Sequence, residues 1–268
     1  MRDSVPRMET SARLAVISGG GGGIGRALCR ELVQRGYEVV ALGRSPRRLR
    51  ELEAMTVRAA DAGASDHPPV RGVVCDVTDE TETDRVLSAL GPVSVLVNNA
   101  GTAESAPLHD TTLRSWHDHL AANATSAFLL TRQVIPGMRE RDRGRVVFIA
   151  STAARAGTPY TAAYTASKHA MLGLARVVAA EVAGTGVTSN AVCPSFVRTP
   201  MTERSVQRIA ERTGRTPEAA QQALTDSGPL GRLVEPEEVA AAVGYFVSDA
   251  AACVNGQSLV LDGGGIQS

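Results

Sequence analysis

The sequence predicts one doubly wound α/β domain, with a seven-stranded parallel sheet and helices on both faces. Short apolar runs rich in β-branched residues recur at wide spacing, which is typical of buried parallel strands. Helix-patterned stretches separate these runs, as crossover connections require. Because the alternation continues along the whole chain, we expect a single domain over 13–268, preceded by a flexible tail over 1–12.

Each element is assigned from its pattern, in chain order. The expected strands are 13–19, 38–43, 71–76, 93–101, 145–151, 187–194 and 258–264. The clearest helical patterns cover 25–36, 45–63, 116–134, 161–183 and 236–250. The stretch 199–229 is also helical in pattern and is placed to cover a substrate, although a plain surface helix pair fits it equally well.

Charge and cysteine usage narrow the function classes. The 268 residues include 28 basic and 28 acidic side chains, whereas nucleic acids and anionic membranes attract a basic excess. The four cysteines are far apart and form no C-x-x-C pair, so neither a zinc site nor a disulfide framework is expected. The opening residues lack the apolar core of a signal peptide, and no run approaches ~20 apolar residues. We therefore expect a cytoplasmic protein without nucleic-acid or membrane partners.

A glycine run follows the first strand and opens the first helix. Gly19, Gly23 and Gly25 fit the pattern G-x-x-x-G-x-G. Ordering glycine costs up to ~1 kcal/mol more than ordering alanine, so a merely flexible turn is a poor explanation of five in succession. Glycine is needed where the backbone approaches a pyrophosphate and where free N–H groups at the helix start face the phosphates. The run therefore predicts a dinucleotide site.

The end of the second strand indicates which dinucleotide. An NAD site usually places an acidic residue there, to bond the ribose 2′-hydroxyl. This chain has Gly43 and then Arg44, with Arg47 and Arg48 one turn further on. A guanidinium can bind a 2′-phosphate with two hydrogen bonds, so NADP(H) is preferred and NAD(H) stays possible. The alternative is that these arginines only solvate a helix start.

Tyr164 and the only lysine of the chain, Lys168, stand four residues apart in a predicted helix. Residues at i and i+4 share one helix face. A free tyrosine has a pKa near ~10, and a nearby ammonium or a positively charged nicotinamide would lower it. Such a phenol is suited to acid–base chemistry at a carbonyl or an alcohol.

Further polar candidates stand near the predicted strand ends. Ser151 closes the fifth strand, where its hydroxyl could bond an oxygen that gains charge. Asn98 and Asn99 close the fourth strand, and Asn123 lies in the helical pattern that follows. For Asn123 alone, simple satisfaction of backbone groups explains the residue better than a catalytic role.

Taken together, these motifs resemble the short-chain dehydrogenase/reductase family over about residues 13–264. The matching stretches are S-G-x-x-x-G-I-G (18–25), C-D-V-T-D (75–79), N-N-A-G (98–101), Ser151 with Y-x-x-x-K (164–168), and C-P-S-F-V-R-T-P (193–200). The resemblance implies a Rossmann fold, a homotetramer, and hydride transfer between a nicotinamide and a ketone or secondary alcohol. This chain departs from the family pattern at Ser18, usually threonine, at Ser195, where Pro-Gly is usual, and in lacking a basic residue in the glycine loop.

The resemblance also implies roles for single residues. Tyr164 would be the acid–base group, Lys168 would lower its pKa and bond the nicotinamide ribose, and Ser151 would hold the substrate oxygen. Asn123 would anchor a water of the proton relay. Asp76 and Val77 would contact the adenine, Asn98 and Gly101 the ribose side, and Val197 and Thr199 the carboxamide. The full expected cofactor set is Ser18, Gly19, Gly23, Ile24, Gly25, Arg44, Asp76, Val77, Asn98, Gly101, Tyr164, Lys168, Val197 and Thr199.

Several substrate classes stay open at this level. The stretches around 149–157, 164–170 and 190–201 look most like bacterial aromatic-polyketide ketoreductases. The stretch 205–224 resembles 3-hydroxybutyrate dehydrogenases, which use NAD. A third alternative is a dinucleotide-sensing protein without catalysis, although such a protein has no need of Ser151, Tyr164 and Lys168 together.

The remaining polar and aromatic candidates are expected to be structural. His109, His117 and His119 are interpreted as solvated or capping residues and not as metal ligands, because 117 and 119 point to different helix faces. Asp262 is expected at a turn or a subunit contact. Trp116, the only tryptophan, is expected in the core, with a place on the substrate wall as the alternative.

Overall fold

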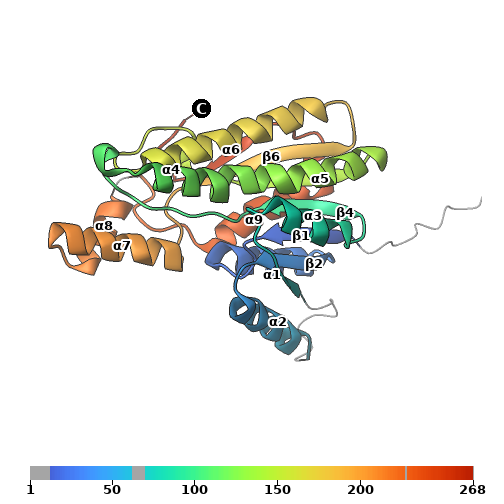
Figure 1. The fold of residues 1–268 in the computed structure, drawn as a ribbon, viewed down its shortest axis with the longest axis horizontal. Coiled ribbons are helices and arrows are strands. Elements are labelled where there is room, and N and C mark those ends of the chain that lie inside the picture. The colour runs from blue at the N-terminus through green and yellow to red at the C-terminus, as the bar shows by residue number, and fades with distance from the viewer. Residues whose placement is uncertain (1–12, 62–69, 227, 268) are drawn as a thin grey trace, which may run out of the picture.

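One parallel sheet organises the molecule in this computed structural model, which describes residues 13–61, 70–226 and 228–267. The predicted tail, 1–12, lies outside this range. Among the described residues, the strands form one seven-stranded sheet in the order β3-β2-β1-β4-β5-β6-β7, which confirms the expected fold class (Figure 1). The strands are β1 (Leu14–Ser18), β2 (Glu38–Gly43), β3 (Arg71–Val74), β4 (Val93–Asn98), β5 (Gly144–Ile149), β6 (Val187–Pro194) and β7 (Ser258–Leu261).

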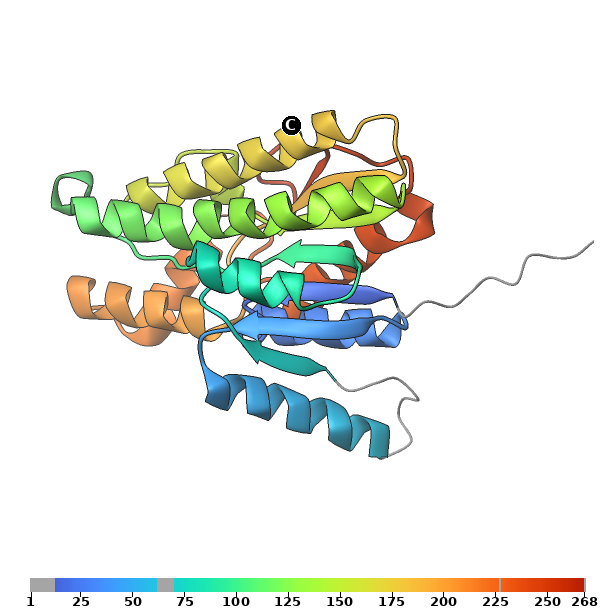
Figure 2. The same cartoon turned by 45° about the vertical axis from the view of Figure 1, so that its right-hand side comes forward.

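Helices cover both faces of the sheet, so that three layers result (Figures 1 and 2). Helices α3, α5 and α6 pack on one face, and α1, α2 and α9 contribute side chains to the core on the other. Within β4, Leu96 faces the first layer whereas Val95 and Val97 face the second. The helices are α1 (Gly23–Gln34), α2 (Pro46–Asp61), α3 (Glu80–Ser88), α4 (Leu113–Leu120), α5 (Ser126–Glu140), α6 (Ala162–Glu181), α7 (Pro200–Thr213), α8 (Pro217–Thr225) and α9 (Pro236–Val247).

The strand order reverses between β1 and β4, which are direct neighbours. The connections from β1 lead outward through β2 to β3, whereas those from β4 lead the other way through β5 and β6 to β7. In open α/β sheets, ligands bind outside the carboxyl ends of the strands at such a switch point. The residues that follow Ser18 and Asn98 therefore border the place where a ligand is expected.

The helical pattern predicted over 116–134 is not one regular α-helix. A π-helical turn, Ala121–Thr125, separates α4 from α5. The wider turn contains Asn123, whose side-chain amide binds the backbone of the preceding loop. Local π turns of this kind occur frequently at functional sites.

Within the segment 199–229, the helices α7 and α8 form a pair at one end of the molecule (Figure 1). Val206 and Ala210 of α7 pack against Ala220 of α8 in a small core of their own. Among the described residues, no helix combines the length and apolar character needed to cross a membrane.

Candidate active site

The carboxyl ends of β1 and β4 are joined through one hydroxyl group. Ser18 Oγ accepts hydrogen bonds from the backbone N–H groups of Asn99 (2.9 Å) and Ala100 (3.0 Å). The side chain of Asn99 binds the end of β1 in turn. Its Nδ2 donates to the carbonyls of Ser18 and Gly19 at 2.9 and 3.2 Å. The Ser18 hydroxyl therefore links the carboxyl end of β1 to the loop after β4, at the point where the strand order reverses.

The glycine loop leaves the start of α1 open. Gly22 is the N-cap, no side chain caps the helix, and no acidic residue stands in its first turn. The first N–H groups of a helix carry partial positive charge and bind anions when no cap occupies them. At Gly25, an added Cβ would overlap the carbonyl oxygen of Gly19, so only glycine allows helix and loop to approach this closely. These features fit a dinucleotide pyrophosphate.

Charged side chains gather at the neighbouring ends of β2 and β3. Arg44 Nη1 lies 4.0 Å from Asp76 Oδ2, and the guanidinium is well exposed. Burial acts to raise the pKa of Asp76, but hydrogen bonds from Thr78 and the charge of Arg44 outweigh it and keep that pKa below its usual value. Arg48 of α2 lies against Gly21, where an added Cβ would meet its Cβ at 3.1 Å. Arg48 therefore borders the glycine loop, and Arg44 lies beside Asp76 at the ends of β2 and β3.

The segment after β6 returns to the same loop. Thr199 caps α7 by accepting a hydrogen bond from Thr202 N–H. An added Cβ on Gly23 would meet Thr199 Cγ2 at 2.7 Å, so the two residues are in contact range. Val197 is buried and pairs with Val234 in an isolated parallel bridge. The structure therefore brings Thr199 next to the glycine loop.

Ser151, Tyr164 and Lys168 meet beyond the end of β5. Ser151 begins a short 3-10 turn (Thr152–Ala154), accepts a hydrogen bond from Ala153 N–H, and bonds the hydroxyl of Tyr164. Lys168 is 5% exposed. Its Nζ donates to the carbonyl of Ile149 at 2.8 Å and lies 5.8 Å from the centre of the Tyr164 ring.

Burial governs the protonation of both titratable groups. It raises the pKa of Tyr164 above its ordinary value, and the hydrogen bond from Ser151 offsets this only in part. It lowers the pKa of Lys168 to about 8. The pKa of Tyr164 in the protein alone is therefore above and not below its ordinary value, because desolvation of the hydroxyl is the largest effect.

Asn123 connects the π turn to this group. Its Oδ1 accepts from Thr102 N–H (2.8 Å), and its Nδ2 donates to the Thr102 carbonyl (3.0 Å) and to Ser167 Oγ (2.8 Å). An added Cβ on Gly101 would meet Asn123 Oδ1 at 2.6 Å and Lys168 Nζ at 3.7 Å. Gly101 therefore allows the loop after β4 to lie directly on Asn123 and close to Lys168.

A family model described as enoyl-(acyl carrier protein) reductase matches residues 20–265. The chain belongs to the short-chain dehydrogenase/reductase family. Its members act on CH–OH and C=O groups, and this chain is an NAD(P)-dependent oxidoreductase of that kind.

Named relatives within the short-chain dehydrogenase/reductase family span almost the whole chain. A Streptomyces violaceoruber protein, named as ketoacyl reductase 1 of the granaticin polyketide synthase, is 38% identical over 257 residues, 94% of this chain and 92% of its own. The D-β-hydroxybutyrate dehydrogenase of Cupriavidus necator is 32% identical, covering 95% and 98%. A single-substitution variant of the actinorhodin polyketide ketoreductase, crystallised with NADPH, superposes with a TM-score of 0.85 at 34% identity, covering 94% and 97%.

One of the expected short-chain dehydrogenase/reductase contacts, that of Asn98, differs in detail. The Asn98 side chain is buried and donates to Thr131 of α5 at 2.9 Å, so it faces away from the glycine loop. The neighbouring Asn99 makes the loop contacts instead, as alternation along a strand requires. Ser167 was also missed, because its link to Asn123 joins two helices that are far apart in sequence.

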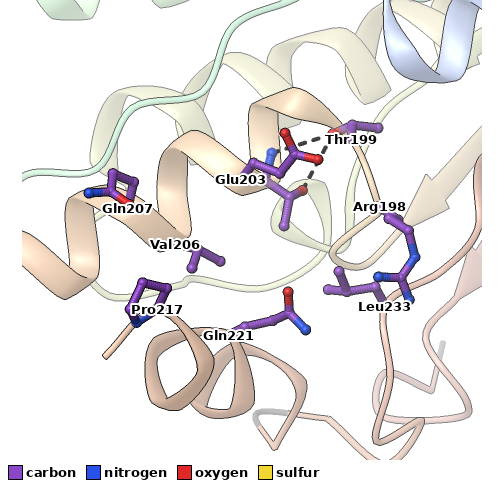
Figure 3. A pocket seen from close by; sticks show the side chains of 9 residues that line it. Arg198, Thr199, Glu203, Val206, Gln207, Pro217, Gln221 and Leu233 are labelled. Atoms are coloured by element: carbon purple, nitrogen blue, oxygen red, sulfur yellow. Dashed lines mark hydrogen bonds between the residues drawn. The ribbon is translucent and has the colours of Figure 1, made fainter. Parts of the chain in front are cut away.

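A cavity of about 310 Å³ lies between α7, α8 and the loop before α9 (Figure 3). Thr199 is the one predicted site residue in its lining, and Ser151, Tyr164 and Lys168 do not take part. The cavity therefore adjoins the reaction site but is distinct from it. Its lining residues are Arg198, Thr199, Thr202, Glu203, Val206, Gln207, Pro217, Gln221 and Leu233.

Three structural assignments have mixed outcomes. Asp262 accepts three backbone N–H bonds, from residues 264, 265 and 266, which confirms a role at a turn. Trp116 is 37% exposed on α4, so the expected place in the core is wrong. His119 is 1% exposed, so it is not a solvated residue, because its helix face packs against α6.

Proposed function

We propose that this chain is an NADPH-dependent ketoreductase in which Tyr164, Ser151 and Lys168 carry the reaction. The supporting observation is their convergence at the carboxyl end of β5, beside the open start of α1. Neither the open helix start nor the three side chains alone would support a ketoreductase. A phosphate-binding helix start without a proton donor serves binding, whereas the two together serve hydride transfer.

Each of these residues has a separate role in the proposed reaction. When bound, NADPH supplies the hydride to the carbonyl carbon. Ser151 Oγ–H and Tyr164 O–H donate hydrogen bonds to the carbonyl oxygen, which gains negative charge as the carbon is reduced. Tyr164 then gives its proton to that oxygen, so the alcohol is complete and a phenolate is left. The ammonium of Lys168 stabilises this phenolate, and Asn123 holds the adjoining loop.

The cofactor choice rests on Arg44. We expect Arg44→Ala to weaken NADPH binding by about 10- to 100-fold, because the 2′-phosphate loses a charge-assisted hydrogen bond, while NADH binding stays within about twofold. Dissociation constants from fluorescence titration of both cofactors measure this. Arg114→Ala is the matched control, since Arg114 is an exposed residue of α4, away from the end of β2, and pairs with Asp118. Equal weakening of NADPH and NADH would contradict the assignment.

The substrate class is tested with a panel of carbonyl compounds. NADPH and NADH oxidation are followed separately with polycyclic ketones, β-ketoacyl thioesters and acetoacetate. We expect turnover of a ketone with NADPH. Turnover of acetoacetate with NADH would instead support the second candidate, a 3-hydroxyacid dehydrogenase, which the similarity to the Cupriavidus necator protein favours. Tight NADPH binding without oxidation across the panel would indicate the dinucleotide sensor.

The oligomeric state and the cellular location of the protein are also proposed. We propose a homotetramer, by family membership, and light scattering during gel filtration measures it. We also propose that the protein works in the cytoplasm, where Cys29, Cys75, Cys193 and Cys253, all unpaired in the structure, stay reduced.

The proposed covering role of 199–229 draws support from the ion pair between Arg208 of α7 and Glu104, at 3.8 Å.

A further inference from the structure

The loop 102–106, which follows β4, is fastened through every second backbone amide. Asn123 Oδ1 accepts from the N–H of Thr102 at 2.8 Å. His119 Nε2 accepts from the N–H of Glu104 at 3.0 Å. The carbonyl of Tyr160 accepts from the N–H of Ala106 at 2.8 Å. His119 thus accepts the middle one of the three hydrogen bonds that hold the loop. The residue does not belong to any of the family motifs quoted above.

The two neighbours of the imidazole determine its tautomer. The backbone N–H of Glu104 can only donate, so His119 Nε2 is unprotonated. The carbonyl of Ser115 can only accept, and it lies 2.7 Å from Nδ1, so Nδ1 carries the hydrogen. With 1% of its surface exposed, the ring is a neutral group with both nitrogens satisfied.

The same ring contacts the proposed proton donor. The rings of His119 and Tyr164 meet edge to face, with centroids 6.5 Å apart and an interplanar angle of 76°. On the far side of the loop, the Glu104 carboxylate lies 3.8 Å from Arg208 of α7. A continuous path of contacts therefore leads from Tyr164 through His119 and Glu104 to the helix that covers the site.

We propose that His119 is a positioning residue, which places the loop 102–106 against Tyr164 and so forms the substrate-binding wall. The inference rests on the proposed function of Tyr164. Filling the space between α4 and α6 needs only an apolar side chain, whereas the bond to Glu104 N–H needs an acceptor at the position of Nε2. The hydrogen-bonding nitrogen therefore has a role that packing does not explain.

Two substitutions of His119 distinguish the contribution of its hydrogen-bond acceptor, Nε2, from that of its aromatic ring. His119→Phe keeps the edge-to-face contact but removes the acceptor, whereas His119→Gln can place an amide oxygen near the position of Nε2. We expect His119→Phe to raise KM for the ketone about 5- to 20-fold and change kcat less than about threefold, because wall contacts hold the ground state and the transition state alike. His119→Gln restores KM to within about twofold of the wild type.

Hydrogen exchange of the loop gives a readout that does not depend on activity. In the full-length protein, peptides covering 102–106 exchange faster in His119→Phe, and His119→Gln returns them towards the wild-type rate. His117→Phe is the matched control, because it places the same side chain at an exposed position of α4. If His119→Phe does not fold, the smaller His119→Val serves as the loss variant.

Two outcomes overturn the proposal. In one, folded loss variants keep the wild-type KM and loop exchange and show only a lower Tm, as a packing residue would. In the other, His119→Gln fails to restore either value. Tyr164→Phe is measured alongside, since activity in that variant refutes the proposed function, while the exchange data still decide the role of His119.

Discussion

Replacing Tyr164 by phenylalanine is expected to lower kcat for ketone reduction by about 10²- to 10⁴-fold and to change the dissociation constant for NADPH little. Only the hydroxyl is lost, because Phe fills the space of the ring and keeps its contact with His119. Ser151 Oγ then remains as the single hydroxyl at the carbonyl oxygen, and an aliphatic hydroxyl is a much weaker acid than a phenol. The alcohol can therefore no longer obtain its proton from a tuned donor.

Steady-state kinetics with the preferred ketone and fluorescence titration with NADPH separate the two effects. Tyr160→Phe provides the control, since this tyrosine lies four residues earlier and is 66% exposed. It should retain wild-type kcat and KM. Near-full activity of Tyr164→Phe would remove the proposed mechanism, because no other described side chain holds the same place between Ser151 and Lys168.

Lys168 is expected to tolerate neither loss of charge nor a change in its shape. Lys168→Met removes the ammonium, and we expect about a 10²-fold lower kcat together with weaker NADPH binding. Lys168→Arg keeps a positive charge, but a planar guanidinium does not fit a 5% exposed position bounded by Ile149 O and Gly101. A comparable loss in both variants would show that a compact charge is required, whereas wild-type rates in Lys168→Arg would refute this.

The pH dependence distinguishes the roles of these two residues. In the folded protein the pKa of Lys168 is lowered to about 8 and that of Tyr164 is raised, so Lys168 loses its proton first as pH rises. The ammonium therefore predominates below about pH 8 and is lost above it, and kcat/KM for NADPH, which reports on the free enzyme, should fall above about pH 8. In Lys168→Arg this alkaline fall should disappear, because a guanidinium stays charged.

The sequence patterns predicted the layers and the strand ends well, because they depend on local apolar periodicity. All seven strands overlap their expected ranges, with shorter ends such as Arg71–Val74 in place of 71–76. The glycine loop and the spacing from Tyr164 to Lys168 were accessible for the same reason. In each case, a few neighbouring residues determine the geometry, and no long-range contact is needed to interpret them.

Features that depend on contacts between distant segments could not be predicted in this way. At the π turn, the amide of Asn123 binds Thr102, a residue of the preceding loop, and the sequence pattern does not show this contact. Asn98 was placed on the cofactor side although strand alternation turns it towards Thr131, and only the neighbouring strands show which face is which. The raised pKa of Tyr164 likewise follows from burial in the assembled core and not from its nearest charge in sequence.

Because the chain has a single lysine, chemical labelling of that residue reports on the proposed catalytic site alone. Apart from the α-amino group of the first residue, Lys168 Nζ is the one aliphatic amine in the chain. Because its pKa is about 8, a sizeable fraction is the nucleophilic free base at mildly alkaline pH, although the fold shields it. Amine-directed labelling, which spreads over many lysines in most proteins, would here measure how often one buried atom becomes accessible to solvent.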